Sequence, residues 1–282
     1  YLNSRGDYDV FVTKLNANGE FAWAKQFGGS KQDLCRTMDL DNAGNVYVGG
    51  AFYGKAFFDN DTLANYFNSI GIRYICIFKL NNNGDLQWAN RIGADKDEAC
   101  YGLTLDAQGN FYTTGYFAGT VDFDPGAGSY PLTYTGVYNA FVAKFDGDGA
   151  LLWAKRMGGS RDIYGRAIMI DDSLNIYTTG QFRETVDFDP GPDTFNLSVT
   201  GYFDIFVSKL DRNGDFEWAK TFGGLDNDGH VYGNDNAFTL AVNRQQQLLV
   251  AGTFWDTISY NIGDDTLLLL PKQDSNKDIC IL

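Results

Sequence analysis

Short apolar runs, each separated from the next by a polar turn ending in glycine, recur along the chain. The clearest example has an apolar run over residues 141–145, a turn over 146–149 and a second run over 151–157, followed by a glycine pair. The Asx residues of such a turn cap their own backbone, and the glycine accepts a positive φ. The pattern predicts a β-hairpin, which we call the signature hairpin.

The signature hairpin returns at a fixed distance of 65 residues. Three residue types keep the same place in all four copies: Lys14, Lys79, Lys144 and Lys209; Gly19, Gly84, Gly149 and Gly214; and Trp23, Trp88, Trp153 and Trp218. Self-similarity at a constant period is typical of a repeat protein. We therefore expect the four tryptophans at one equivalent position, packed between successive repeats.

A second hairpin, the companion hairpin, precedes the signature hairpin within each repeat. Its strands are expected at 35–40 with 45–50, 100–105 with 110–115, 165–170 with 175–180, and 237–242 with 247–252. Four antiparallel strands in about 65 residues are typical of a β-propeller blade. The alternative is a parallel β-solenoid, whose coils are usually shorter and lack such antiparallel turns.

The predicted fold is thus all-β: a β-propeller built from four-stranded repeats, forming a segment of a larger or incomplete ring. Residues 1–282 are one propeller region. It divides into a partial blade (1–29), three blades (30–94, 95–159 and 160–224) and an incomplete blade with a polar insert (225–282). Asp9 and Asp278 have the same phase, so both ends bring the same strand. The expected partners therefore include the remaining blades of a parent protein.

Composition and charge exclude several classes of function. Aromatic residues make up 16% of the chain and charged residues 21%, which describes a folded protein with an ample core. A net charge of −14 repels phosphate backbones, so nucleic acid is not an expected partner. No apolar run approaches the roughly 20 residues of a spanning helix, so no membrane span is expected. The cysteines, Cys35, Cys76, Cys100 and Cys280, are interpreted as core fillers by their phase.

The residues offer little for catalysis, and no catalytic residue is predicted. The only histidine is His230, which lies in the polar insert of the last repeat and is interpreted as a solvated loop residue. No nucleophile elbow, phosphate-binding loop or zinc-binding helix motif is present.

One pattern could hold a metal ion. Two carboxylates recur on one side of an extended segment between the hairpins: Asp122 with Asp124, and Asp187 with Asp189. Such pairs could bind Ca²⁺ together with backbone carbonyls, and no other cofactor is expected. The competing interpretation is a turn, because the second position is Asx in all four repeats.

The repeated pattern resembles a known family. Asp-x-Phe-Val-x-Lys-Leu-Asp-x-Asn-Gly-x-x-x-Trp-Ala-Lys-x-x-Gly-Gly, followed by x-Asp-x-x-Gly-Asn-x-Tyr-x-x-Gly, resembles the SBBP-type β-propeller repeat of large secreted or surface proteins, many from Bacteroidetes. The resemblance covers residues 9–252 and departs at 245–247, where three glutamines replace the usual turn residues. It implies an extracellular or cell-surface setting and brings no defined catalytic residues.

Three functional hypotheses follow. The first is a non-enzymatic module of a larger protein that presents loops on one propeller face to a protein or glycan. The second is a glycan-active hydrolase or lyase on the same scaffold, and the third is a purely architectural spacer. Because a fold does not select a function, the residues on one face must decide.

Overall fold

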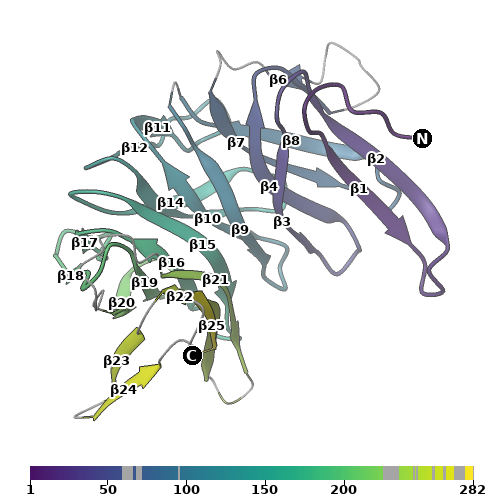
Figure 1. The fold of residues 1–282 in the computed structure, drawn as a ribbon. Coiled ribbons are helices and arrows are strands. Elements are labelled where there is room, and N and C mark those ends of the chain that lie inside the picture. The colour runs from purple at the N-terminus through teal and green to yellow at the C-terminus, as the bar shows by residue number, and fades with distance from the viewer. Residues whose placement is uncertain are drawn as a thin grey trace. The chain divides into compact units, whose positions relative to one another are not determined.

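The computed structural model of the chain describes residues 1–58, 66–67, 72–94, 96–224, 235–243, 245, 247–255, 258–262, 265–269 and 277–281. Side chains are described up to residue 255, except at 66–67. Every regular element in these ranges is a β-strand (Figure 1). Burial alternates with a period of two in β1 (Val10–Leu15): Val10 and Val12 are buried, while Phe11 is exposed. This is the alternation predicted for strands.

Most strands follow the predicted order of companion hairpin and then signature hairpin. The first signature hairpin joins β1 to β2 (Phe21–Gly29). The repeats then contribute β3 (Leu34–Leu40), β4 (Val46–Tyr53), β7 (Arg73–Leu80) and β8 (Leu86–Ile92); β9 (Ala99–Leu105), β10 (Phe111–Phe117), β13 (Asn139–Phe145) and β14 (Leu151–Gly159); β15 (Ile163–Ile170), β16 (Ile176–Phe182), β19 (Asp204–Leu210) and β20 (Phe216–Phe222); and β21 (Asn236–Val242), β22 (Leu248–Trp255) and β25 (Lys277–Ile281).

The hydrogen-bonded strand orders confirm the all-β fold class. Two repeats each form a four-stranded sheet of their own, β3-β4-β7-β8 and β15-β16-β19-β20, and in both the strands are antiparallel. In the third, β9, β10, β13 and β14 adjoin one another in that order. The described strands of the last sheet are β21-β22-β25. The repeat alignment is also confirmed, because each signature hairpin with a described register has its irregularity just after the conserved lysine.

Between the two hairpins of each repeat lies a further small hairpin, where the sequence predicted one short strand and a turn. These link hairpins are β5 (Ala56–Phe57) with β6 (Tyr66–Phe67), β11 (Thr120–Asp122) with β12 (Pro131–Thr133), β17 (Thr185–Asp187) with β18 (Asn196–Ser198), and β23 (Ile258–Ile262) with β24 (Asp265–Leu269). Two of them extend the sheet of the preceding repeat. β5 pairs with the glycine pair of β2, and β17 pairs with that of β14.

The chain forms two compact units. The first comprises Tyr1–Thr113, Phe117–Thr133 and Lys144–Ala154, and the second Thr114–Tyr116, Tyr134–Ala143 and Lys155–Leu282. Within the first, Val10, Val12 and Phe27 pack against Phe78 and Leu80 of the following repeat. Burying this apolar layer between successive repeats supplies most of the driving force for their association.

An equivalent layer forms within the second unit. There Ile205 and Val207 of β19 pack with Val250 and Phe254 of β22. The prediction that cysteines fill the core is confirmed for Cys76 and Cys100, whereas Cys35 is exposed. The side chain of Cys280 lies outside the described residues.

The turn of each signature and companion hairpin is held by an Asx side chain at its first position. Asp146 Oδ1 accepts hydrogen bonds from the backbone N–H groups of Asp148 and Ala150 at 3.0 and 2.9 Å. In the last companion hairpin, Asn243 Oδ1 accepts from Gln245 and Gln247, both at 2.9 Å. The glutamines there change the turn's sequence but not its capping.

The fourth turn position has a positive φ, and glycine occupies it in most turns. Gly109 has φ 85° there, and an added Cβ would meet no atom within 4 Å. In the turn after β15 the same place is taken by Leu174, with φ 64°. A branched side chain in the left-handed region is strained, so this turn stores energy that its counterparts do not.

Leu174→Gly is therefore expected to stabilise the protein by about 1 kcal/mol, because it removes the left-handed strain. Gly109→Ala is the matched control and is expected to destabilise by a similar amount. The added methyl group would meet no other atom there, so the positive φ alone opposes it. Urea denaturation of both variants measures the effect. A Leu174→Gly variant less stable than the wild type would show that the partial burial of Leu174 outweighs its strain.

Candidate functional site

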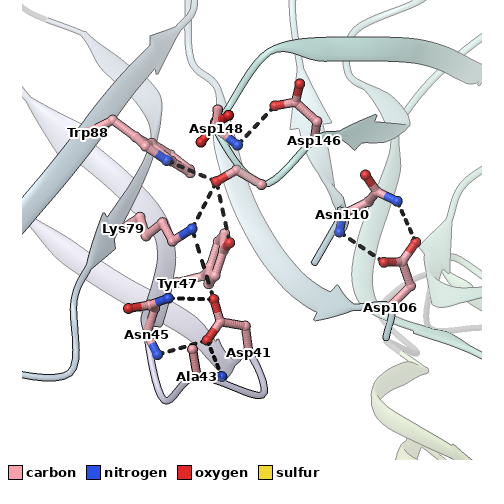
Figure 2. Close-up of polar contacts among 11 residues, drawn as sticks. Asp41, Ala43, Asn45, Tyr47, Lys79, Trp88, Asp106, Asn110, Asp146 and Asp148 are labelled. Atoms are coloured by element: carbon pink, nitrogen blue, oxygen red, sulfur yellow. Dashed lines mark hydrogen bonds and ion pairs between the residues drawn. The ribbon is translucent and has the colours of Figure 1, made fainter. Parts of the chain in front are cut away.

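The turn of the third signature hairpin receives three side chains from the repeat before it. The carbonyl oxygen of Gly147 accepts hydrogen bonds from Lys79 Nζ at 3.0 Å, Trp88 Nε1 at 3.2 Å and Tyr47 Oη at 3.4 Å (Figure 2). Tyr47 comes from the companion hairpin, and the other two come from paired positions of β7 and β8. We call this arrangement the turn clasp.

The same clasp joins the first signature hairpin to the repeat after it. Lys14 Nζ and Trp23 Nε1 both donate to the carbonyl oxygen of Asn82 at 3.1 Å. Asn82 and Gly147 occupy the same turn position, 65 residues apart. The prediction that the repeated tryptophans pack between successive repeats is confirmed for Trp23 and Trp88. Both are half-buried.

A partly buried carboxylate supports the clasp from the companion turn. Asp41 Oδ2 lies 3.9 Å from Lys79 Nζ, and the ammonium also sits 4.8 Å from the centre of the Tyr47 ring. The same carboxylate accepts hydrogen bonds from Ala43 N, Asn45 N and Asn45 Nδ2 (Figure 2). Burial opposes ionisation of Asp41, but these hydrogen bonds and Lys79 hold its pKa below the usual range.

The counterparts of Asp41 make the same turn contacts. Asp106 accepts from the backbone N–H and side-chain amide of Asn110 at 2.8 Å each. Asp171 does so with Asn175 at 2.9 and 2.8 Å, and its pKa is also lowered despite burial. The periodic polar residues thus hold turns and join repeats. These residues have structural roles. The candidates for a functional site are therefore residues that differ from their counterparts in the other repeats.

The calcium candidates lie in the link hairpins as turn residues. Asp122 Oδ1 accepts from Asp124 N at 3.0 Å and Tyr130 N at 2.7 Å, while Asp124 Oδ1 accepts from Gly126 N at 2.8 Å. The hydrogen bond from Tyr130 is the main reason that the pKa of Asp122 is lowered.

Asp187 and Asp189 repeat these contacts with Phe195 and Gly191. Among the described residues no group of three or more His, Cys, Asp or Glu side chains is placed to hold a metal. Each pair keeps oxygens outside these hydrogen bonds, and calcium binding there stays a prediction. His230 and the polar insert lie outside the described residues.

Aromatic and arginine side chains gather in the second unit, some of them at positions where the preceding repeat has a different type of residue. Tyr116 of β10 contacts Tyr138 and Tyr164, with ring centres 5.1 and 5.2 Å apart and rings nearly perpendicular. Tyr138 and Tyr164 are 5.5 Å from each other. Tyr116 is buried, whereas the other two are partly exposed. A buried ring thus fixes two surface tyrosines in place.

The group continues through the residues that lead into β19. Phe203 lies 6.2 Å from Tyr164 and 5.2 Å from Tyr202. The guanidinium of Arg183 stacks 3.9 Å from the centre of Tyr202, and that of Arg166 lies 5.4 Å from Tyr164. Such cation–π contacts hold both arginines over the rings. We call the whole group the Tyr–Arg cluster: Tyr116, Tyr138, Tyr164, Arg166, Arg183, Tyr202 and Phe203.

Acidic residues lie beside the Tyr–Arg cluster. The backbone carbonyl of Asp162 accepts from Arg183 N at 2.8 Å. Burial raises the pKa of the Asp162 carboxyl, and the charges of Arg183 and Arg161 oppose that rise. Another nearby carboxylate, Glu184, is paired with Arg161 at 3.1 Å. Arginines and carboxylates thus lie together around the cluster, since Asp204 directly follows Phe203 and Asp235 N donates to the Phe203 carbonyl at 3.2 Å.

This cluster was not predicted from the sequence, because its members come from five separated stretches. A signal was present, namely departure from the period. The positions of Arg183 and Tyr202 hold Ala118 and Val137 one repeat earlier, so neither residue is needed to build a repeat. Only the folded chain brings these exceptions together.

Comparison with known proteins supports a repeat architecture. The chain matches no family model. An uncharacterized WD repeat-containing protein of Acanthamoeba polyphaga mimivirus is 24% identical over 214 residues, which covers 72% of this chain and 14% of that protein. The chain therefore spans about a seventh of that relative's length. WD repeats are four-stranded propeller blades, so the likeness agrees with the four-stranded sheets found here.

None of the described residues belongs to a helix long and apolar enough to cross a bilayer.

The lowered pKa values of Asp41 and Asp171 predict how stability responds to acid. A carboxyl whose pKa is lower in the folded than in the unfolded state stabilises the fold above the unfolded value, about 4, and loses this contribution as the pH falls through the folded pKa. Asp41→Asn with Asp171→Asn is expected to flatten the loss of stability below about pH 4, since asparagine caps the corresponding turn at Asn243 without titrating.

Urea denaturation across a pH series measures this difference. Asn243→Asp is the complementary variant and is expected to steepen the acid response. Equal slopes for the wild type and the double variant would show that these two carboxylates do not govern acid stability.

Proposed function

We propose that this chain is a propeller-type module that binds a protein partner through the Tyr–Arg cluster and performs no catalysis of its own. The observation that carries the proposal is the gathering of partly exposed tyrosines and arginines, among them Arg183 and Tyr202, whose positions hold Ala118 and Val137 one repeat earlier. Tyrosine and arginine are enriched at the energetic centres of protein interfaces. The WD repeat-containing relative supports an interaction role only through its shared repeat architecture.

Pre-organisation favours this surface as a binding site. Tyr138 and Tyr164 are packed against buried Tyr116, and Tyr202 is covered by Arg183. Side chains already held in place lose little entropy when a partner binds. The face of Tyr202 is occupied by Arg183, so this ring does not offer the free flat surface on which a sugar could stack. Protein is therefore the proposed ligand in preference to glycan.

The absence of catalysis is part of the same proposal. The periodic carboxylates cap turns, and Glu184 beside the cluster is engaged by Ser160 and Arg161 at 2.9 and 3.1 Å. A hydrolase or lyase would need a poised acid and base facing one substrate. We further propose an extracellular or cell-surface setting, on the strength of the resemblance to secreted propeller repeats.

A display experiment tests the proposal directly. The wild-type chain is used to select binders from a phage-displayed peptide library, and a glycan array is probed in parallel. We expect selected peptides whose affinity falls about tenfold or more for Arg183→Ala and Tyr202→Ala, the loss typical of truncating an interface anchor.

Tyr130→Ala is the matched control. Tyr130 is 39% exposed and belongs to the link hairpin of the first unit, so its loss is expected to leave peptide affinity unchanged. Peptides that bind both cluster variants as well as the wild type would reject this site. Glycan binding that depends on the cluster would reject the choice of ligand.

A further inference from the structure

The first signature hairpin exposes an apolar face that its later copies bury. Phe11, Leu15 and Phe21 are 66%, 54% and 68% exposed. The counterparts of Phe11 are Cys76, Phe141 and Phe206, and the counterpart of Leu15 is Leu80; all are at most 1% exposed. Three large apolar side chains on one hairpin are an unusual surface, and such patches mark interaction sites.

The structure shows what covers this face in the next repeats. Cys76 and Leu80 share one core cluster with Val10 and Val12 of the hairpin one period earlier. In the second unit, Ile205 and Val207 contribute in the same way to the repeat that follows them. The covering side chains come in both cases from the preceding signature hairpin. Each signature hairpin therefore packs one face against the repeat after it and the other face against the repeat before it. In β1–β2 the face that would pack against a preceding repeat is exposed.

Among the described residues, no tryptophan packs on the turn of this hairpin, in contrast to the turns of the next two signature hairpins. A Cβ added to Gly84 would lie 2.9 Å from the Trp23 ring, and one added to Gly149 would lie 3.2 Å from the Trp88 ring. At Gly19, the counterpart of both, an added Cβ would meet no described atom within 4 Å. Ala17, which occupies the position of Asn82 and Gly147, is exposed. The place that a tryptophan takes in the later repeats is open here.

The strand pairing of β1 differs from that of its counterparts. Among the described strands, β1 is hydrogen-bonded to β2 alone. Its counterparts β7, β19 and β25 each pair with the second strand of a companion hairpin, and a glycine always faces the counterpart of Phe11: Gly50 with Cys76, Gly180 with Phe206, and Gly252 with Cys280. The partner expected for β1 is therefore a strand with glycine opposite Phe11.

We propose that the face and edge of β1–β2 are the docking surface for a preceding repeat of the same polypeptide. Its signature hairpin would cover Phe11, Leu15 and Phe21 and place a tryptophan over Gly19, while the following companion hairpin would pair with β1. Each described companion hairpin already pairs with the signature strand that follows it, so a second copy of the chain offers β1 no free companion hairpin, and a repeat earlier in sequence is selected. The inference rests on the proposed propeller architecture and not on the Tyr–Arg cluster, so the two can fail separately.

The test supplies such a repeat from the chain itself. Residues 139–203 contain a signature, a companion and a link hairpin, and they end just before Asp204, the counterpart of Asp9. They are placed directly ahead of Asp9, and the chain that starts at Asp9 is the control. We expect backbone hydrogen exchange in residues 9–29 to slow about tenfold or more in the extended chain, because exposed edges exchange faster than paired ones.

Two variants test the contacts of the proposed docking surface separately. Trp153→Ala in the appended copy alone should restore part of the fast exchange, because that tryptophan is the one placed over Gly19. Phe11→Ser should leave the melting temperature of the control unchanged and lower that of the extended chain. Unchanged exchange in residues 9–29 would overturn the proposal, and so would an appended segment that remains unstructured by circular dichroism. A concentration-dependent dimer of the control that protects β1 would assign the surface to a second copy.

Discussion

The structure depends on one recurring contact: a turn carbonyl that accepts hydrogen bonds from a lysine and a tryptophan of the repeat before it. The tight turn directs this carbonyl away from its own hairpin, so it must find donors elsewhere once solvent is excluded. Lys79 and Trp88 supply them for Gly147, and Lys14 and Trp23 for Asn82. Each bond contributes only about 1 kcal/mol, but nearest-neighbour terms accumulate along a repeat protein.

The strands, the period and the turns could be predicted because each depends on neighbours within a few residues. Asx caps and glycines determine the turns locally, and alternation determines the strands. Other features follow from contacts distant in sequence. The second strand of each link hairpin and the strained Leu174 have no clear local signal, and the exposure of Cys35 reflects its place in the first complete repeat.

Periodicity also separates building residues from candidate functional ones. Lysine, tryptophan and turn aspartate recur because every repeat must be built and joined in the same way. Arg183 and Tyr202 stand where the preceding repeat has Ala118 and Val137, and the fold brings the Tyr–Arg cluster together from β10, β15, the residue after β16 and the approaches to β13 and β19. A reading of the sequence by repeats can identify such exceptions but cannot tell that they meet.

A double-mutant cycle on Lys79 and Trp88 measures the turn clasp most directly. Lys79→Met and Trp88→Phe each remove one donor to the Gly147 carbonyl while keeping most of the side-chain volume. If the carbonyl depends on this pair, the double variant loses more stability than the sum of the single variants, by about 1 kcal/mol, because only the longer contact from Tyr47 remains. Strictly additive losses in urea denaturation would contradict the account.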